Sequence, residues 1–159
     1  MSVTELSRDR VEGRLASLEE TYSSFPINQT TLSVSTGVYE RAHERCEAGL
    51  VDVYVTVYND AEDVLLLENE DAWELPHAES ATGERLEERA RTEVRNATGV
   101  RCSITGVRRV TILGLLDETE ADCDPVYQLV AVLSARHVEG SPGEAVEWRS
   151  TLPDSARPI

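Results

Sequence analysis

Lysine is absent from this chain of 159 residues, and all 15 of its basic side chains are arginines, against 30 Asp and Glu. The net charge of −15 argues against a nucleic-acid partner, because a nucleic-acid groove needs a stripe of basic side chains. Arg108 and Arg109 are the only adjacent basic residues, and we expect them at a strand end on the surface.

Cysteine and long apolar runs are also scarce. Cys46, Cys102 and Cys123 are an odd number without CxxC spacing, which predicts a reducing compartment, no disulfide framework and buried thiols rather than metal ligands. No apolar run approaches the roughly 20 residues of a membrane span. The N-terminus lacks the basic and apolar regions of a signal peptide. We therefore expect a cytoplasmic protein without a membrane partner.

The acidic composition without lysine resembles that of proteins from salt-loving archaea, whose cytoplasm is nearly saturated with salt. On this interpretation the charge keeps the protein hydrated and soluble in brine and says little about its partners.

Hydrophobic periodicity predicts both helices and strands. Two of the helices lie near the N-terminus, and the first is expected to begin at Thr4. The predicted helices cover residues 4–24 and 38–48 and the run that starts near Thr82 and Gly83 and ends at Ala97. The predicted strands cover residues 30–36, 50–58, 64–67, 102–107, 109–116 and 126–135.

The stretch from residue 73 to residue 100 organises the chain, because it reads as a strand end, a loop, a helix and a glycine stop. Apolar side chains recur in it at three- and four-residue steps, which predicts one helix face on a sheet: Leu86, Ala90, Val94 and Ala97. Glu84, Glu88 and, further round, Glu93 are expected on the other side. Gly99 follows the last helical residue, where a left-handed cap is expected.

This stretch resembles the Nudix box, whose pattern is Gly, five residues, Glu, seven residues, then Arg-Glu-apolar-x-Glu-Glu-x-Gly-apolar. The lead-in Trp73-x-Leu75-Pro76 and Gly99 fix the register at both ends. Glu84 and Glu93 match two of the consensus glutamates. Four consensus residues are replaced: Ala78 stands for the first Gly, Thr92 for the Arg, and Asn96 and Ala97 for the paired Glu.

The resemblance implies a site for Mg²⁺ or Mn²⁺ on that helix, because hard cations take oxygen ligands. It assigns Glu93 as the catalytic base or a metal ligand, with Glu84 and Glu88 as further metal ligands. Ala78, through its backbone carbonyl, and Asn96, through its neutral side-chain oxygen, could bind the cofactor. In the acidic loop 117–125, Glu118 and Glu120 are either a further ligand or, as we favour, solvated.

A second match follows near the C-terminus, where an acidic strand reaches Trp148 and then Leu152-Pro153, like the Nudix C-terminal signature. Together the matches cover about residues 49–153. The implied fold is α/β, a Nudix α/β/α sandwich around a mixed sheet with an extra N-terminal helix. We predict a helical extension, residues 1–48, packed on a Nudix domain, residues 49–159; alternatively, its first helix pairs with a second subunit.

The resemblance leaves three functions open. We favour a domain that binds a nucleotide or a nucleoside diphosphate derivative without turnover, because the metal ligands are depleted. The alternative is an active Mg²⁺-dependent pyrophosphohydrolase that uses Glu93 and Glu84. The third is a folded domain with a solvated helix face that forms a homodimer.

Overall fold

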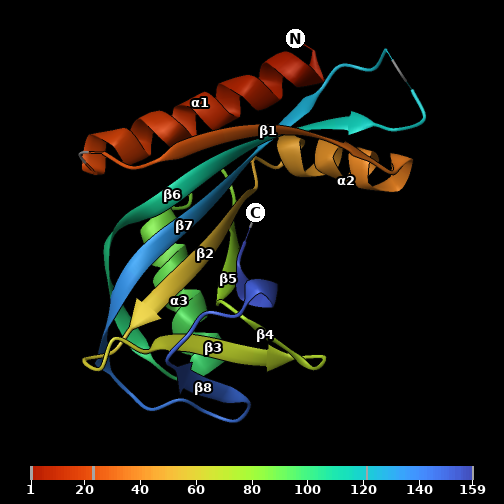
Figure 1. Cartoon of the computed structure of the whole chain (residues 1–159). Coiled ribbons are helices and arrows are strands. Elements are labelled where there is room, and N and C mark those ends of the chain that lie inside the picture. Colours follow the sequence, from red (N-terminus) through yellow and green to blue (C-terminus); the bar gives the residue numbers. More distant parts are fainter. Residues whose placement is uncertain (1, 23, 121, 159) are drawn as a thin grey trace.

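The computed structural model describes residues 2–22, 24–120 and 122–158. In this part of the chain, α-helices pack against one sheet (Figure 1). The α-helices are α1 (Val3–Thr21), α2 (Thr36–Glu47) and α3 (Leu86–Thr98). The strands are β1 (Ile27–Val34), β2 (Val51–Tyr58), β3 (Val64–Asn69), β4 (Ala72–Glu74), β5 (His77–Ser80), β6 (Arg101–Asp117), β7 (Val126–Glu139) and β8 (Val146–Arg149), and a 3₁₀ turn, η1 (Asp154–Ala156), follows.

The sheet is mixed, with the strand order β1-β6-β7-β2-β3-β4. β1 pairs parallel with β6 and β2 pairs parallel with β7, whereas β6 and β7 are antiparallel. β5 also pairs with β2, and β8 pairs with β3. The predicted α/β class with a mixed sheet is therefore confirmed.

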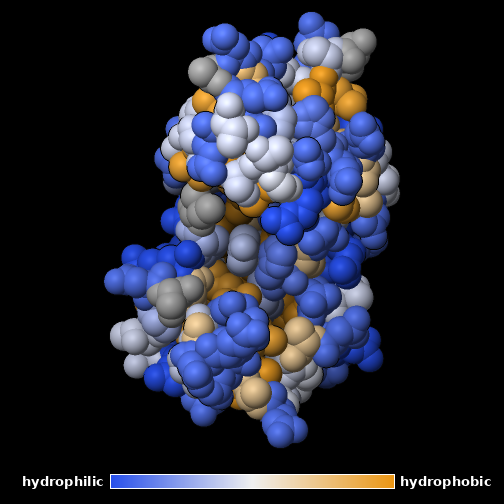
Figure 2. All heavy atoms as spheres, turned by 90° about the vertical axis from the view of Figure 1, so that its right-hand side faces the viewer, coloured by the Kyte–Doolittle hydropathy of each residue, from blue (hydrophilic) through white to orange (hydrophobic). Residues whose placement is uncertain are grey.

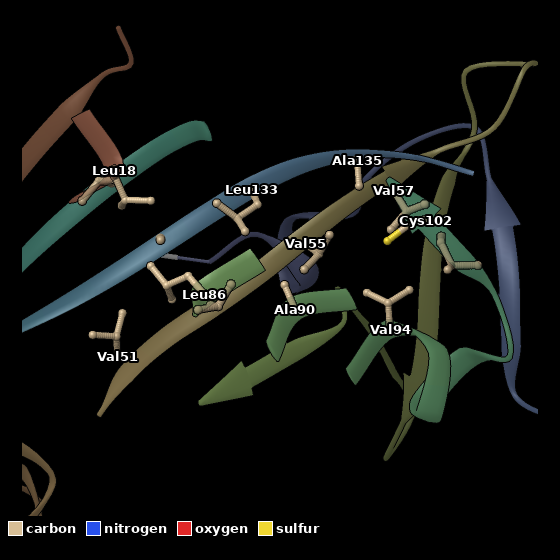
Figure 3. Packing of buried hydrophobic residues seen from close by; sticks show 14 of the residues in the cluster. Leu18, Val51, Val55, Val57, Leu86, Ala90, Val94, Cys102, Leu133 and Ala135 are labelled. Atoms are coloured by element: carbon tan, nitrogen blue, oxygen red, sulfur yellow. The ribbon is translucent and has the colours of Figure 1, made fainter. Parts of the chain in front are cut away.

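Helices cover both faces of this sheet. Alternate residues of β2 and β7 point to one face and, with residues of α1 and α3, form the main core (Figure 3). This core includes Val55, Leu133, Leu18, Ala90 and Val94. A second cluster on the other face joins α2 to β6 and β7 through Ala42, Cys46, Leu113 and Val130. Because side chains of a strand alternate between its two sides, both layers come from the same strands.

Helix α1 is fixed to the start of β7. Its N-cap is Ser2, whose hydroxyl accepts from the Glu5 backbone N–H, so the predicted start at Thr4 is wrong. The Thr4 hydroxyl instead donates to the Pro125 carbonyl at 2.6 Å, and the Ser7 hydroxyl accepts from the Tyr127 N–H at 2.9 Å. These bonds and the buried α1 side chains place the helix on the sheet.

Three other element predictions need correction. Strand β1 starts three residues before the predicted position, and it pairs with β6, so the first 48 residues contribute a strand to the sheet as well as helices. The two strands predicted after α3 are one long strand, β6, with register shifts near Ile104 and Val107 that bend it without ending it. Helix α3 starts at Leu86 rather than near Thr82. The division of the chain at residue 48 stays a prediction.

On the side shown in Figure 2, hydrophilic residues cover most of the surface and apolar residues form small groups. Among the described residues, no helix is long and apolar enough to cross a membrane.

Candidate functional site

The candidate site is the loop from β5 into α3 together with the adjoining face of α3. The helix is positioned by a buried stripe, which packs on β2, β5 and β6 and consists of Leu86, Ala90, Val94 and Thr98. The stripe differs from the prediction in its last member, since Thr98 is buried and Ala97 is only half-buried.

Gly99 ends the helix in the predicted left-handed conformation, with φ of 80°. A side chain would be strained at this φ, and a Cβ atom here would lie 3.1 Å from the Ser141 carbonyl oxygen. The Gly143 N–H also donates to the Thr98 carbonyl, so the turn 140–143 closes over the helix end.

The loop before α3 is held from outside by α1. The Arg14 guanidinium donates to the carbonyls of Ser80, Ala81 and Glu84, and Arg10 donates to the Thr82 hydroxyl at 2.6 Å. Burial lowers the pKa of Arg14, although nearby Glu84 opposes this shift. Helix α1 therefore contacts the segment that the Nudix resemblance assigns to the site.

The predicted metal ligands lie on different sides of α3. Glu93 follows Glu88 by five positions, which places them about 140° apart around the helix. Glu88 is exposed and, with Glu84, lines an open hollow that also includes Arg85, Arg89 and Thr92. The Glu84 carboxylate accepts from the Ala81 N–H at 2.7 Å and so closes the loop before the helix.

Glu93 lies on a flank of α3 beside the buried stripe, and its neighbour there is a cation. Arg89 Nη2 is 3.7 Å from Glu93 Oε2, one helical turn away, and Arg89 Nε donates to the Glu79 carbonyl at 3.2 Å. We call this set of side chains the acid-poor flank: Arg89, Glu93, Asn96 and Ala97. Asn96 is exposed, and Ala97 has no ligand atom on its side chain.

Ala78 is buried in β5, opposite Val53 in the antiparallel ladder. The Val55 N–H donates to the Pro76 carbonyl, and alternation along the ladder then directs the Ala78 carbonyl toward Val53. The next carbonyl, that of Glu79, points out of the ladder and accepts from Arg89.

The donor set does not fit a divalent cation that is held by several carboxylates. Within residues 2–22, 24–120 and 122–158, no group of three or more His, Cys, Asp or Glu is placed to hold a metal ion. Mg²⁺ and Ca²⁺ sites use oxygen ligands, commonly charged ones, and on the acid-poor flank the one carboxylate is paired with Arg89. Glu118 directly follows β6, at the opposite end of that strand from α3, and its N–H donates to the Val34 carbonyl shortly before α2 begins.

A second polar cluster lies on the opposite face of β2. Arg45 of α2 contacts Asp52 at 2.7 Å and Glu79 at 3.1 Å, and His77 Nε2 lies 3.1 Å from Asp52 Oδ1. The ring of Tyr54 stacks on that of His77 with centroids 4.6 Å apart. Burial alone would raise the pKa of Asp52, but the hydrogen bond to His77 and the charge of Arg45 lower it overall.

The cysteines are free thiols, as far as the described residues show. Cys102 is buried in the main core, where desolvation raises its pKa to about 11, so it stays a thiol at neutral pH. Cys46 is also buried, and Cys123 lies half-buried beside Asp117, whose N–H contacts its sulfur.

Sequence reasoning missed two arginines. Arg89 was visible in principle, because a cation four residues before an acid on a helix is a standard pairing signal. Arg14 carried no such signal, because it meets its carbonyl partners across more than sixty residues of chain.

No protein-family model and no curated protein matches the chain. Solved structures do match. A MutT protein from Bacillus halodurans is 19% identical over 63% of this chain and 67% of its own, with a TM-score of 0.51. A UDP-X diphosphatase is 19% identical over 64% of this chain, with a TM-score of 0.48, and an ADP-ribose pyrophosphatase from Streptococcus suis 89-1591 is 15% identical over 65% of this chain and 77% of its own, with a TM-score of 0.46.

The chain spans half the length of the UDP-X diphosphatase that it matches. The Bacillus halodurans protein alone among these three exceeds a TM-score of 0.5, and at 19% identity its likeness shows the fold only. The protein therefore has a Nudix-like fold, as the strand–loop–helix and the C-terminal signature predicted.

Proposed function

We propose that this protein is a nucleotide-binding domain of Nudix fold, which holds a nucleoside diphosphate derivative without hydrolysing it, in a cytoplasm of high salt. The observation that supports this proposal is the acid-poor flank of α3. Its one carboxylate, Glu93, lies 3.7 Å from the Arg89 guanidinium, and its other two members are Asn96 and Ala97. A guanidinium at this position supplies positive charge for a diphosphate, which a metal ion would otherwise have to supply.

Arg89 can perform the binding step itself. A guanidinium is planar and always charged, and it matches two phosphate oxygens with two parallel N–H groups. A diphosphate would replace the long contact to Glu93, while the bond from Arg89 Nε to the Glu79 carbonyl keeps the side chain extended over β5. Arg85, in the same hollow, is the second cation available.

Glu84 and Glu88 also line this hollow and repel an anion. Molar salt weakens that repulsion, because the Debye length at 1 M is only about 3 Å. The distance between a phosphate oxygen and the Arg89 guanidinium in direct contact is comparable to this length or shorter. Salt therefore weakens that attraction less than it weakens the repulsion. High salt thus favours recognition by contact over recognition by long-range charge.

The test combines binding and turnover in molar KCl. Nucleoside triphosphates, nucleotide sugars, dinucleoside polyphosphates and ADP-ribose are each measured for a rise in melting temperature and, with Mg²⁺ or Mn²⁺, for product release. We expect at least one compound to raise the melting temperature, none to be cleaved, and Arg89→Gln to abolish the rise. Arg95→Gln, an exposed arginine on the same helix, is the matched control and should leave it unchanged.

An active hydrolase would give a different pattern. Turnover that disappears in Glu93→Ala would show that Glu93 carries catalysis with the remaining glutamates, and it would overturn the proposal. The absence of both binding and turnover across the panel would also overturn it and would favour a solvated helix face.

A further inference from the structure

Strand β1 forms an open edge of the sheet. It pairs with β6 on one side, and within the described residues no strand pairs with its other side (Figure 1). Six of its eight residues are exposed and the other two are half-buried. Its exposed apolar side chains include Ile27, 45% exposed, and Leu32, 38% exposed.

The composition of this edge differs from that of the rest of the molecule. Residues 21–39 contain no charged side chain and form the longest uncharged run in a chain with 28% charged residues. Edge strands are usually protected from pairing by charged residues, internal prolines or bulges. β1 has none of these, because Pro26 precedes the strand and the pairing with β6 runs without a register shift from Ile27 to Val34.

The hydrogen-bonding groups of β1 alternate between its two sides. The carbonyls of Pro26 and Val34 accept from β6, from Val110 and Glu118. Even-numbered residues of the strand therefore direct their carbonyls toward β6, and odd-numbered residues present their N–H and C=O groups outward. The outward set is Ile27, Gln29, Thr31 and Ser33.

We infer that the outer edge of β1 binds β1 of a second copy of this chain, antiparallel, about a two-fold axis at Thr30. In this register Ile27 faces Ser33 of the second copy and Gln29 faces Thr31. All four outward residues on each chain then exchange hydrogen bonds, and no outward group is left unpaired. A two-fold interface needs such self-complementarity, because the same patch meets itself.

A second copy is the favoured occupant because of charge. Each molecule carries a net charge of −15, and two copies repel each other wherever their acidic surfaces meet. The uncharged edge is where two copies can approach with least repulsion. Molar salt reduces the remaining repulsion further.

The first test is the solution mass of the full chain in molar KCl, by sedimentation velocity over a range of concentrations. We expect a dimer that dissociates on dilution. Gln29→Pro removes an outward N–H that β6 does not use, so the fold tolerates it and the dimer is lost. Gln29→Thr keeps the N–H and a strand-forming side chain, and it should dimerise like the parent chain.

The second test fixes the register and does not depend on the proline variant. Thr30 lies opposite its own copy in a non-hydrogen-bonded pair, where the Cα atoms are about 4.5 Å apart, within disulfide range. Thr30→Cys should form a covalent dimer on mild oxidation. In Asn28→Cys the new thiol faces Leu32 of the second copy, so this variant should form no more covalent dimer than the parent chain. A monomer at every concentration, or equal cross-linking by both variants, would overturn the inference.

Discussion

Two regions of α3 lie less than one turn apart but meet different requirements. One is the apolar contact of its buried stripe with the sheet, which we call the dry contact. The other is the acid-poor flank beside it. In the dry contact, Ala90 and Val94 are fully buried against Val53 and Val55. On the flank, Arg89 and Glu93 are each about one-third exposed. Close packing restricts the size and polarity of the side chains in the dry contact. The side chains of the flank stay in contact with water, so their size and polarity can vary.

This difference explains how a Nudix-like fold can coexist with a helix flank on which one carboxylate, Glu93, is paired with Arg89. The helix is positioned by its stripe, by the glycine at its end and by Arg14, and none of these depends on carboxylates at positions 96 and 97. The fold therefore depends on packing, whereas the chemistry of the site depends on the side chains of the flank.

The largest effect is expected for a charge placed in the dry contact. Val94→Asp buries a carboxylate without a partner and should lower the free energy of unfolding by about 4 kcal/mol or more. The matched change on the flank, Asn96→Asp, should stay within about 0.5 kcal/mol, because that side chain is exposed. Denaturant unfolding in molar KCl, followed by the fluorescence of the two tryptophans, measures both. A similar loss in the free energy of unfolding for the two variants would show that Val94 does not belong to the buried stripe.

The same distinction sets what the sequence could predict. The alternating pattern of β2 and the apolar stripe of α3 reflect burial directly. The predicted bounds of these two elements therefore lie within a few residues of the observed ones. The joining of two predicted strands into β6 could not be foreseen, because a bulge is fixed by the neighbouring strand and not by local composition. The start of α1 was missed because Ser2 and Thr4 both suit an N-cap, and only the distant Pro125 carbonyl engages Thr4.

The site was less predictable than the fold. Glu84, Glu88 and Glu93 were singled out from the sequence, but their spacing alone did not reveal that Glu84 closes its own loop or that Arg89 pairs with Glu93. Side-chain partners depend on three-dimensional neighbours, and several of these come from α1, far away in sequence.

A smaller effect is expected from restoring acids to the flank. Asn96→Glu together with Ala97→Glu adds two carboxylates within one turn of Glu93 and should tighten Mn²⁺ binding by at least about tenfold, since charged oxygens dominate such sites. Titration calorimetry measures the change. The control is Asn96→Gln with Ala97→Gln, which lengthens the same two side chains without adding charge. Equal binding by both double variants would mean that the register or the face assignment is wrong.

The smallest effect concerns the polar cluster on the far face of β2. His77 and Arg45 hold the pKa of Asp52 below its ordinary value, against the opposing effect of burial. The folded chain therefore binds a proton at Asp52 less readily than the unfolded chain does, and the cluster stabilises the fold above the ordinary Asp pKa of about 3.9. This stability is lost as the pH falls through the lower folded value.

Between pH 6 and pH 3, the melting temperature of the parent chain should thus fall more steeply than that of Asp52→Asn, which has no proton to gain. Asp9→Asn, at an exposed position of α1, should follow the parent chain. Parallel curves for the parent chain and Asp52→Asn would show that Arg45 and His77 do not stabilise the ionised carboxylate. The cluster would then hold α2 on the sheet by packing alone, as the dry contact holds α3.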